Sequence, residues 1–176
     1  MRSTAAPICS GVTAVYGDAR NAADVALALK PGFDTVFTCL GSGALKPSTL
    51  MTQSTQAILA AMHGAGINRL IAVSGTAEMP DQTRWGRIYT AILTRTPVGH
   101  AVRDHDGAAA LVRASDVSWV LVGCNYIANG AAKGHYRTAT VFPGGFKTIK
   151  AGDVADFMLH EAMDRKYHQQ AVGLWY

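Results

Sequence analysis

The stretch Thr35-Val36-Phe37-Thr38-Cys39-Leu40-Gly41-Ser42-Gly43 decides the fold of this chain. Six residues without a charge are followed directly by a glycine-rich turn, which is the pattern of a strand buried on both faces of a parallel sheet. Such a strand needs helices on either side to cover it. The rest of the sequence therefore has to supply helices and further strands around this run.

The segments around this run alternate between helical and extended patterns. Apolar residues recur at helical spacing in five segments that we predict to be helices: residues 22–29, 47–65, 85–94, 102–114 and 153–165, the last capped by Asp153. Short β-prone runs predict strands at residues 12–16, 70–73 and 119–122, and a strand or ribbon at 136–142. We therefore expect an α/β protein with a doubly wound parallel sheet, organised as a single domain over residues 1–176.

The composition is that of a globular protein and argues against several classes of function. Of the 176 residues, 49% are hydrophobic and 16% are charged, which suits one compact domain with a buried core. No apolar run reaches the roughly 18 residues that span a bilayer, and residues 1–10 lack the apolar segment of a secretory signal. We therefore predict a cytoplasmic protein with no membrane partner.

Charges, cysteines and histidines exclude further classes. The net charge of +4 comes from dispersed Lys and Arg residues, without the basic runs of a nucleic-acid-binding surface. Three scattered cysteines suit neither a disulfide framework nor a zinc site, and His100 and His105 are too far apart to share a helical face. We expect no nucleic acid and no metal, while a mildly basic surface favours a phosphate-bearing ligand.

Small and polar residues follow each of the first three predicted strands. Asp18 follows the first strand, Gly41 to Gly43 the second, and Ser74 and Thr76 the third. Because the carboxyl ends of parallel strands meet at one edge of the sheet, we expect these residues to line one crevice. Glycines there let backbone amides approach a ligand closely, and they also suit a strand-to-helix turn. Asp18 fits a ligand contact and a turn or helix cap equally well.

Several short phrases occur in order along the chain: Gly17-Asp18, Leu40-Gly41-Ser42, Val73-Ser74, Gly134-His135-Tyr136, and Asp153 with Phe157-Met158-Leu159. Together they resemble the atypical short-chain dehydrogenase/reductases that contain the NmrA-like proteins, most closely the flavin reductase (biliverdin-IXβ reductase) group. The resemblance runs from about residue 12 to residue 176. It implies a Rossmann-like fold that binds NADP, or else NAD, at the carboxyl ends of its strands.

The resemblance also implies roles for individual residues. Those expected to bind the cofactor are Arg2, Asp18, Ala19, Leu40, Gly41, Ser42, Gly43, Ser74 and Cys124. Arg2 would contact the 2′-phosphate of NADP. Ser74 and Thr76 are the catalytic candidates, since a hydroxyl there can donate a hydrogen bond to a carboxamide or a substrate carbonyl, and Tyr126 would stack on a flat substrate. Each of these three also fits a plain turn or packing role.

Two features of the wider superfamily are missing from the sequence. No glycine-rich phosphate loop occurs between Met1 and Asp18, so we expect a Rossmann-like sheet that lacks its first strand-helix-strand unit and is incomplete at the N-terminus. Sheet edges exposed in this way leave self-association open. None of the six tyrosines has a lysine four positions on, so the usual Tyr-x-x-x-Lys proton donor is absent. The flavin reductase group does without this pair, because a reduced flavin or tetrapyrrole can draw its proton from solvent.

These observations favour an NAD(P)H-dependent reductase of a flavin, a quinone or another small planar acceptor, impaired by the loss of the glycine-rich loop. A non-catalytic, NmrA-like protein that senses a dinucleotide or regulates a partner is the alternative. A structural fragment without a ligand is a third hypothesis. The physiological acceptor, the choice between NADP and NAD, and the oligomeric state stay open at this point.

Overall fold

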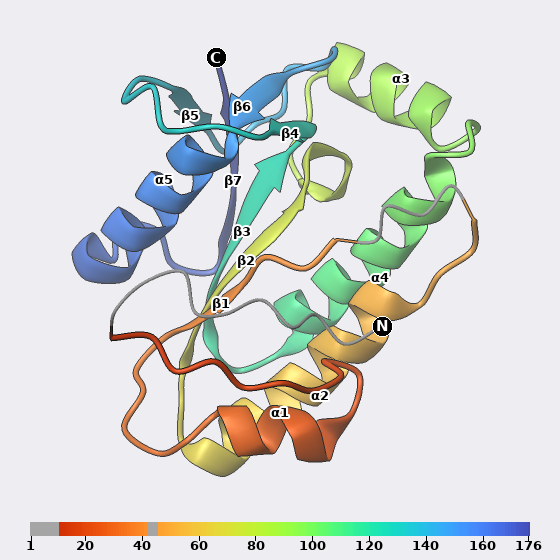
Figure 1. Cartoon of the computed structure of the whole chain (residues 1–176). Helices are drawn as coiled ribbons and strands as arrows, with labels where there is room; N and C mark the ends of the chain where they lie inside the picture. The colour runs from red at the N-terminus through yellow and green to blue at the C-terminus, as the bar shows by residue number, and fades with distance from the viewer. Residues whose placement is uncertain (1–10, 42–45) are drawn as a thin grey trace.

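The structure is a computed structural model that describes residues 11–41 and 46–176, with helices and strands arranged as in Figure 1. The helices are α1 (Ala22–Ala28), α2 (Leu50–Ala65), the short 3-10 helix η1 (Thr76–Glu78), α3 (Arg84–Leu93), α4 (Gly99–Ala114) and α5 (Ala151–Asp164). The strands are β1 (Val36–Thr38), β2 (Arg69–Gly75), β3 (Ser118–Cys124), β4 (Tyr126–Ala128), β5 (Arg137–Ala139), β6 (Thr148–Lys150) and β7 (Gln170–Trp175). Arg2, Ser42 and Gly43, which are expected to bind the cofactor, lie outside the described residues.

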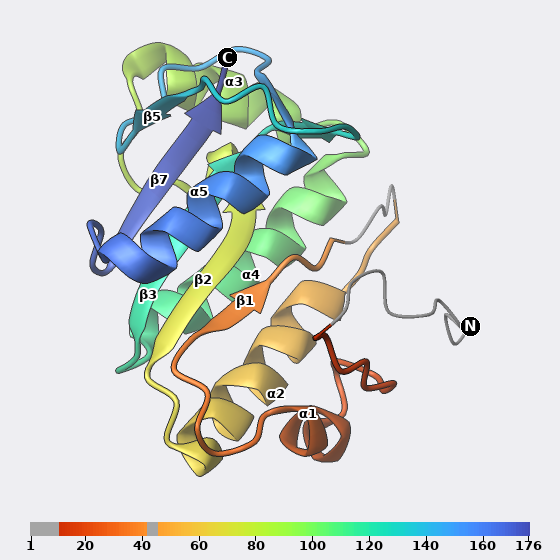
Figure 2. The same cartoon turned by 60° about the vertical axis from the view of Figure 1, so that its left-hand side comes forward.

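The strands form one five-stranded sheet in the order β1-β2-β3-β7-β5 and a separate pair, β4 with β6. In the large sheet β1, β2, β3 and β7 are parallel, and β5 runs antiparallel to β7. Helices α2 and α4 lie on one face of this sheet and α5 on the other (Figure 2). The expected α/β, Rossmann-like architecture is confirmed. Within residues 11–41 and 46–176 no helix is long and apolar enough to cross a bilayer.

The sequence of β2 explains why this strand is buried on both faces. Leu70 and Ala72 join a core that includes Met62 of α2, whereas Ile71 joins a second core with Phe157 of α5. Successive side chains of a strand point to opposite faces, so a continuous apolar run fills both cores at once. Strand β3 follows the same alternation, and together the two strands form the centre of the sheet.

The amino-terminal end of α2 is held by a side chain from another helix. Asp104 of α4 accepts hydrogen bonds from the backbone N–H groups of Met51 and Thr52, each at 3.0 Å, and from the Thr52 hydroxyl at 2.9 Å. The first N–H groups of a helix have no acceptor within it, so this carboxylate acts as a cap supplied from a distance. Burial alone would raise the pKa of Asp104, but these donors outweigh it and hold the pKa below its usual value.

Two expectations about secondary structure are wrong. Residues 12–16 form no strand, because in the described part of the chain no neighbouring strand pairs with them. Asp153 is not the cap of α5, since Lys150 occupies the N-cap position. Asp153 instead lies in the first turn, fully buried, and accepts hydrogen bonds from the backbone N–H groups of Lys133 and Gly134 and from the Tyr176 hydroxyl.

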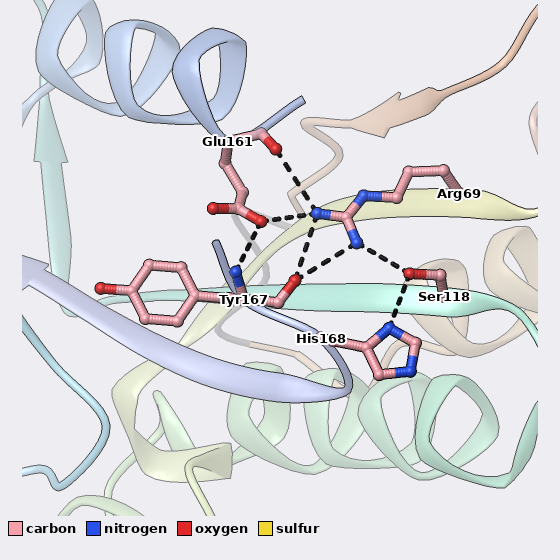
Figure 3. A network of polar contacts seen from close by, with 5 residues as sticks. All are labelled: Arg69, Ser118, Glu161, Tyr167 and His168. Atoms are coloured by element: carbon pink, nitrogen blue, oxygen red, sulfur yellow. Dashed lines mark hydrogen bonds and ion pairs between the residues drawn. The ribbon is translucent and has the colours of Figure 1, made fainter. Parts of the chain in front are cut away.

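Strand β7 is an addition that the sequence pattern does not predict, and a polar network fixes the loop before it (Figure 3). Arg69, at the start of β2, pairs with Glu161 of α5 at 2.5 Å and donates to the backbone carbonyl of Tyr167 at 3.3 Å. It also donates to the Ser118 hydroxyl at 2.7 Å, and this hydroxyl lies 3.0 Å from Nδ1 of His168. The network joins α5, β2 and β3 to the chain just ahead of β7, at the amino ends of the central strands.

Candidate functional site

A cavity of about 650 Å³ lies at the carboxyl ends of β1, β2 and β3, at the opposite end of these strands from the Arg69 network. Its walls come from these strand ends, from η1, from the first half of α4, from α5 and from the start of β4. In an open parallel sheet this edge is the usual place for a ligand, because the loops that follow the strands diverge there and leave a crevice.

Ser74 and Thr76, the two predicted catalytic residues, both line this cavity. Ser74 is the last residue but one of β2, and Thr76 begins η1 directly after the strand. The two residues are 7% and 2% exposed, so both are largely shielded from bulk water. Both residues carry a hydroxyl, which can donate a hydrogen bond to a ligand or accept one from it. Their roles stay predictions.

Leu40, Gly41, Cys124 and Tyr126 line the same cavity. Among the described residues nothing lies within 4 Å of the place where a Cβ of residue 41 would stand, so no described atom crowds Gly41. Burial raises the pKa of the Cys124 thiol to about 12, so this group stays protonated at neutral pH. Tyr126 is 54% exposed, with its ring 6.0 Å from that of Phe146. The structure thus brings together six of the sequence-predicted residues around one space.

Asp18 and Ala19 lie in a neighbouring pocket of about 270 Å³, between α1, β1 and the chain ahead of α1. Cys39 and Leu40 line both pockets, so the two adjoin at the end of β1. Asp18 pairs with Arg20 at 2.6 Å, and hydrogen bonds from Arg20 lower the pKa of Asp18 to about 2. Asp18 is therefore an anion held in a turn, beside the main cavity rather than inside it.

Sequence reasoning missed two polar residues in the wall of the main cavity, Glu78 and Asn125. Oε2 of Glu78 and Oδ1 of Asn125 are buried and have no hydrogen-bond partner among the described residues. A signal was present for Glu78, which is the single charged residue between Leu70 and Pro80 and lies just past a predicted strand end. No comparable signal marks Asn125, which is an uncharged residue directly after Cys124. Unpartnered buried oxygens of this kind are acceptors that a bound molecule can use.

His105 of α4 also lines the cavity. Burial lowers the pKa of His105, although the neighbouring Asp104 carboxylate opposes the shift. The imidazole is therefore neutral at neutral pH. In the part of the chain that the structure describes, no group of three or more His, Cys, Asp or Glu side chains is arranged to hold a metal ion.

A comparison with known protein families identifies the family of this chain. Residues 2–165 match the family model described as NAD(P)H-binding. The chain belongs to this NAD(P)H-binding family. The match covers nearly the whole chain, and it confirms the NAD(P)-binding family that the resemblance of the sequence phrases implies.

Several solved structures share the fold of this chain at low sequence identity. The oxidoreductase ylbE from Lactococcus lactis is 19% identical, with a TM-score of 0.75 over 96% of this chain and 74% of that one. ChuY from Escherichia coli O157:H7, described as an anaerobillin reductase, is 20% identical, with a TM-score of 0.73 over 90% and 72% of the two chains. A short-chain dehydrogenase/reductase from Veillonella parvula in complex with NADP is 18% identical, with a TM-score of 0.66 over 91% and 70%.

The residues of the cavity suit the cofactor of this family. A nicotinamide nucleotide needs small residues near its phosphates and polar atoms near its carboxamide. Gly41 would meet the first need, and the hydroxyl of Ser74 and the buried oxygen of Asn125 would meet the second. The adjoining pocket at Asp18 extends this space past the end of β1.

Proposed function

We propose that this protein is an NAD(P)H-dependent reductase that transfers a hydride to a small planar acceptor such as a flavin or a quinone. The observation that carries the proposal is the arrangement of Ser74, Thr76 and Tyr126 around one cavity at the carboxyl edge of the sheet, next to the pocket at Asp18. Membership of the NAD(P)H-binding family supports it. We also propose that residues 1–176 act as one domain in the cytoplasm.

The proposed cofactor placement follows the two adjoining spaces. Asp18 and Ala19 would hold the adenine, and Leu40 with Gly41 would let the backbone pass close to the ribose and diphosphate. Ser74 and Asn125, which line the same cavity, would orient the nicotinamide carboxamide, and the bound nicotinamide would supply the hydride. We favour NADP over NAD because the net charge is positive and a structural neighbour holds NADP, with Arg2 as the proposed partner of the 2′-phosphate.

The proposed acceptor lies at the mouth of the cavity. Tyr126 is half exposed there and tilts against Phe146 at 37° between ring planes, so the pair offers an aromatic surface to a flat molecule. Neighbours described as an oxidoreductase and as a reductase support a small-molecule substrate. Positioning two flat rings against each other accounts for most of what such a reaction requires of a protein.

Binding and turnover separate this function from its alternatives. NADPH is titrated while its fluorescence is followed, and FMN or menadione is then added while absorbance at 340 nm records oxidation. We expect saturable binding and acceptor-dependent oxidation. The Ser74→Ala variant should bind NADPH about tenfold more weakly, since one hydrogen bond is lost. Asp164→Asn, at the exposed end of α5, serves as the matched control.

The remaining outcomes decide between the other hypotheses. Binding of NADPH without oxidation by either acceptor would favour the non-catalytic, dinucleotide-sensing alternative, since the absent Tyr-x-x-x-Lys pair fits both this alternative and the reductase. No binding at millimolar NADPH or NADH would remove both ligand-based functions.

A further inference from the structure

Glu78 reaches back over the end of β2 and fills the space beside Gly75. A Cβ built on Gly75 would overlap Oε2 of Glu78 and would lie 3.1 Å from its carboxyl carbon. The backbone at Gly75 has φ −91° and ψ 162°, which any residue can adopt. Glycine is therefore needed at this position for space and not for conformation, and the space is taken by a carboxyl group next to Ser74.

This carboxyl group is buried in the cavity wall, and one of its oxygens has no partner among the described residues. Glu78 is 6% exposed, and Oε2 has no hydrogen-bond partner in the part of the chain that the structure describes. Its own backbone carbonyl accepts a hydrogen bond from Arg113 of α4 at 3.2 Å, which fixes η1 in place. A buried carboxyl without a bound cation is far more stable with its proton than without it.

The charged groups around Glu78 agree with a carboxyl that keeps its proton near neutral pH. Burial raises the pKa of Glu78 to about 7, and the carboxylate of Asp106 adds to this. The backbone N–H groups of Glu78 and Gly75 and the Arg113 guanidinium oppose the shift without cancelling it. Of the other groups that line the cavity, His105 has a pKa below its usual value and the Cys124 thiol is neutral. A group that titrates near the working pH is suited to proton transfer.

We propose that Glu78 is the proton donor of the reduction, in place of the absent Tyr-x-x-x-Lys pair, an inference that rests on the reductase function proposed above. A C–H bond of the bound dihydronicotinamide would break, and its hydride, with the electron pair, would form a C–H, N–H or O–H bond on the acceptor. The O–H bond of Glu78 breaks, and its proton goes to the acceptor oxygen or nitrogen on which negative charge collects. Solvent then returns a proton to Glu78, so the sum is one NAD(P)H and one proton consumed per acceptor reduced.

This role also narrows the class of acceptor. Proton donation by the protein accelerates the reaction most where reduction leaves negative charge on an oxygen, as with a quinone. It matters least where solvent can protonate the product after the hydride step, as with a free flavin. The loss of Glu78 should therefore slow quinone reduction more than flavin reduction.

A spectroscopic test needs no cofactor. Glu78 and Glu161 are the two glutamates of the sequence, so ¹³C labelling of the glutamate side-chain carboxyl gives two glutamate signals. We expect one of them to titrate with a midpoint near 7 in the cofactor-free protein and to vanish in Glu78→Gln. A Glu78 midpoint below about 5, the ordinary range of an exposed glutamate, would overturn the proton-donor role.

Kinetics supply the second test. With menadione at pH 6, Glu78→Gln should lower kcat about 100-fold while NADPH binding stays within about twofold, since the amide keeps the shape but carries no acidic proton. The wild-type rate should fall above pH 7, and this dependence should be absent in the variant. Flavin reduction should fall far less.

The outcomes separate the two proposals. An active wild type together with an equally active Glu78→Gln variant, or with a variant that only binds NADPH more weakly, would overturn the proton donor and leave the reductase function standing. A wild type that oxidises NADPH with neither acceptor would overturn the reductase function, and the proton donor with it. Should Glu78→Gln fail to fold, Gly75→Ser, whose side chain displaces the carboxyl group, provides the same comparison.

Discussion

Arg69 and Glu161 form an ion pair at the amino end of β2 in which both side chains are almost fully buried, at 5% and 2% exposed. Arg69 comes from the sheet and Glu161 from α5, so this pair joins the sheet to the helix that covers one of its faces. Removal of one partner leaves the other charge buried without compensation.

We therefore expect Glu161→Ala to lower the free energy of unfolding by about 3 to 5 kcal/mol, measured by urea denaturation. The double variant Arg69→Met with Glu161→Leu should be far closer to wild type, because no charge is left unpaired. Equal losses in the single and double variants would show that packing, and not the charge, carries the effect.

Asp104 offers a test of the cap that α4 supplies to α2. Replacement by alanine should destabilise the fold by about 1 to 2 kcal/mol, since two N–H groups lose their acceptor. The folded state holds the pKa of Asp104 below its usual value. The stabilisation is therefore fully present above the ordinary aspartate pKa and is lost as the pH falls through the lowered value. Denaturation curves of wild type and variant should differ at neutral pH and converge at acidic pH.

The contribution of Glu78 to stability depends on pH in the opposite direction from that of Asp104. Its folded pKa of about 7 exceeds the unfolded value of 4.5, so the folded state binds the proton more tightly and stability falls as the pH rises between these values. The shift corresponds to about 3 kcal/mol lost from pH 4.5 to 7. Glu78→Gln should remove this dependence and be more stable than wild type at pH 8. Thermal melts across this range check the prediction, and parallel curves for the two proteins would contradict it.

Tyr126 tests the acceptor side of the cavity. Tyr126→Ala should raise the KM for FMN or menadione about tenfold through loss of ring stacking, with little change in NADPH binding. Steady-state kinetics and fluorescence titration measure the two effects separately. Weaker NADPH binding with an unchanged acceptor KM would place Tyr126 on the cofactor instead.

Self-association through the edge of the sheet stays a prediction. Strand β1 pairs with β2 alone in the described residues, and Phe37 in its centre is 40% exposed. An exposed edge strand favours pairing with another chain, and a charge there opposes it. We expect sedimentation velocity to show concentration-dependent dimers that Phe37→Lys weakens. A monomer at all concentrations would exclude this edge as a contact.

The centre of the fold could be predicted because its signals are local. Strands β2 and β3 are continuous apolar runs that end in small residues, and the rule that parallel strands end at one edge predicted that Gly41 and Ser74 line one cavity. Strand β7 escaped prediction because Gly173 interrupts a short run and the Arg69 network, which fixes the preceding loop, joins residues far apart in sequence.

The remaining errors have the same origin. Residues 12–16 look β-prone, but a strand exists only where a partner accepts its hydrogen bonds. Asp153 looks like a helix cap, but its partners are Lys133, Gly134 and Tyr176. Glu78 drew no prediction, because its place as the single charged residue of an apolar stretch does not show that the side chain fills the space beside Gly75.

The Arg69 network and the cavity lie at opposite ends of the same strands. Because of this separation, residues at the cavity can be substituted without altering the contacts of the network. Substitutions around the cavity mouth should not affect the ion pair that joins α5 to the sheet. Substitutions near this ion pair should not affect the residues that contact a ligand. A library that varies Tyr126, Ile127 and Phe146 should therefore yield new acceptor preferences in proteins that melt within a few degrees of the parent.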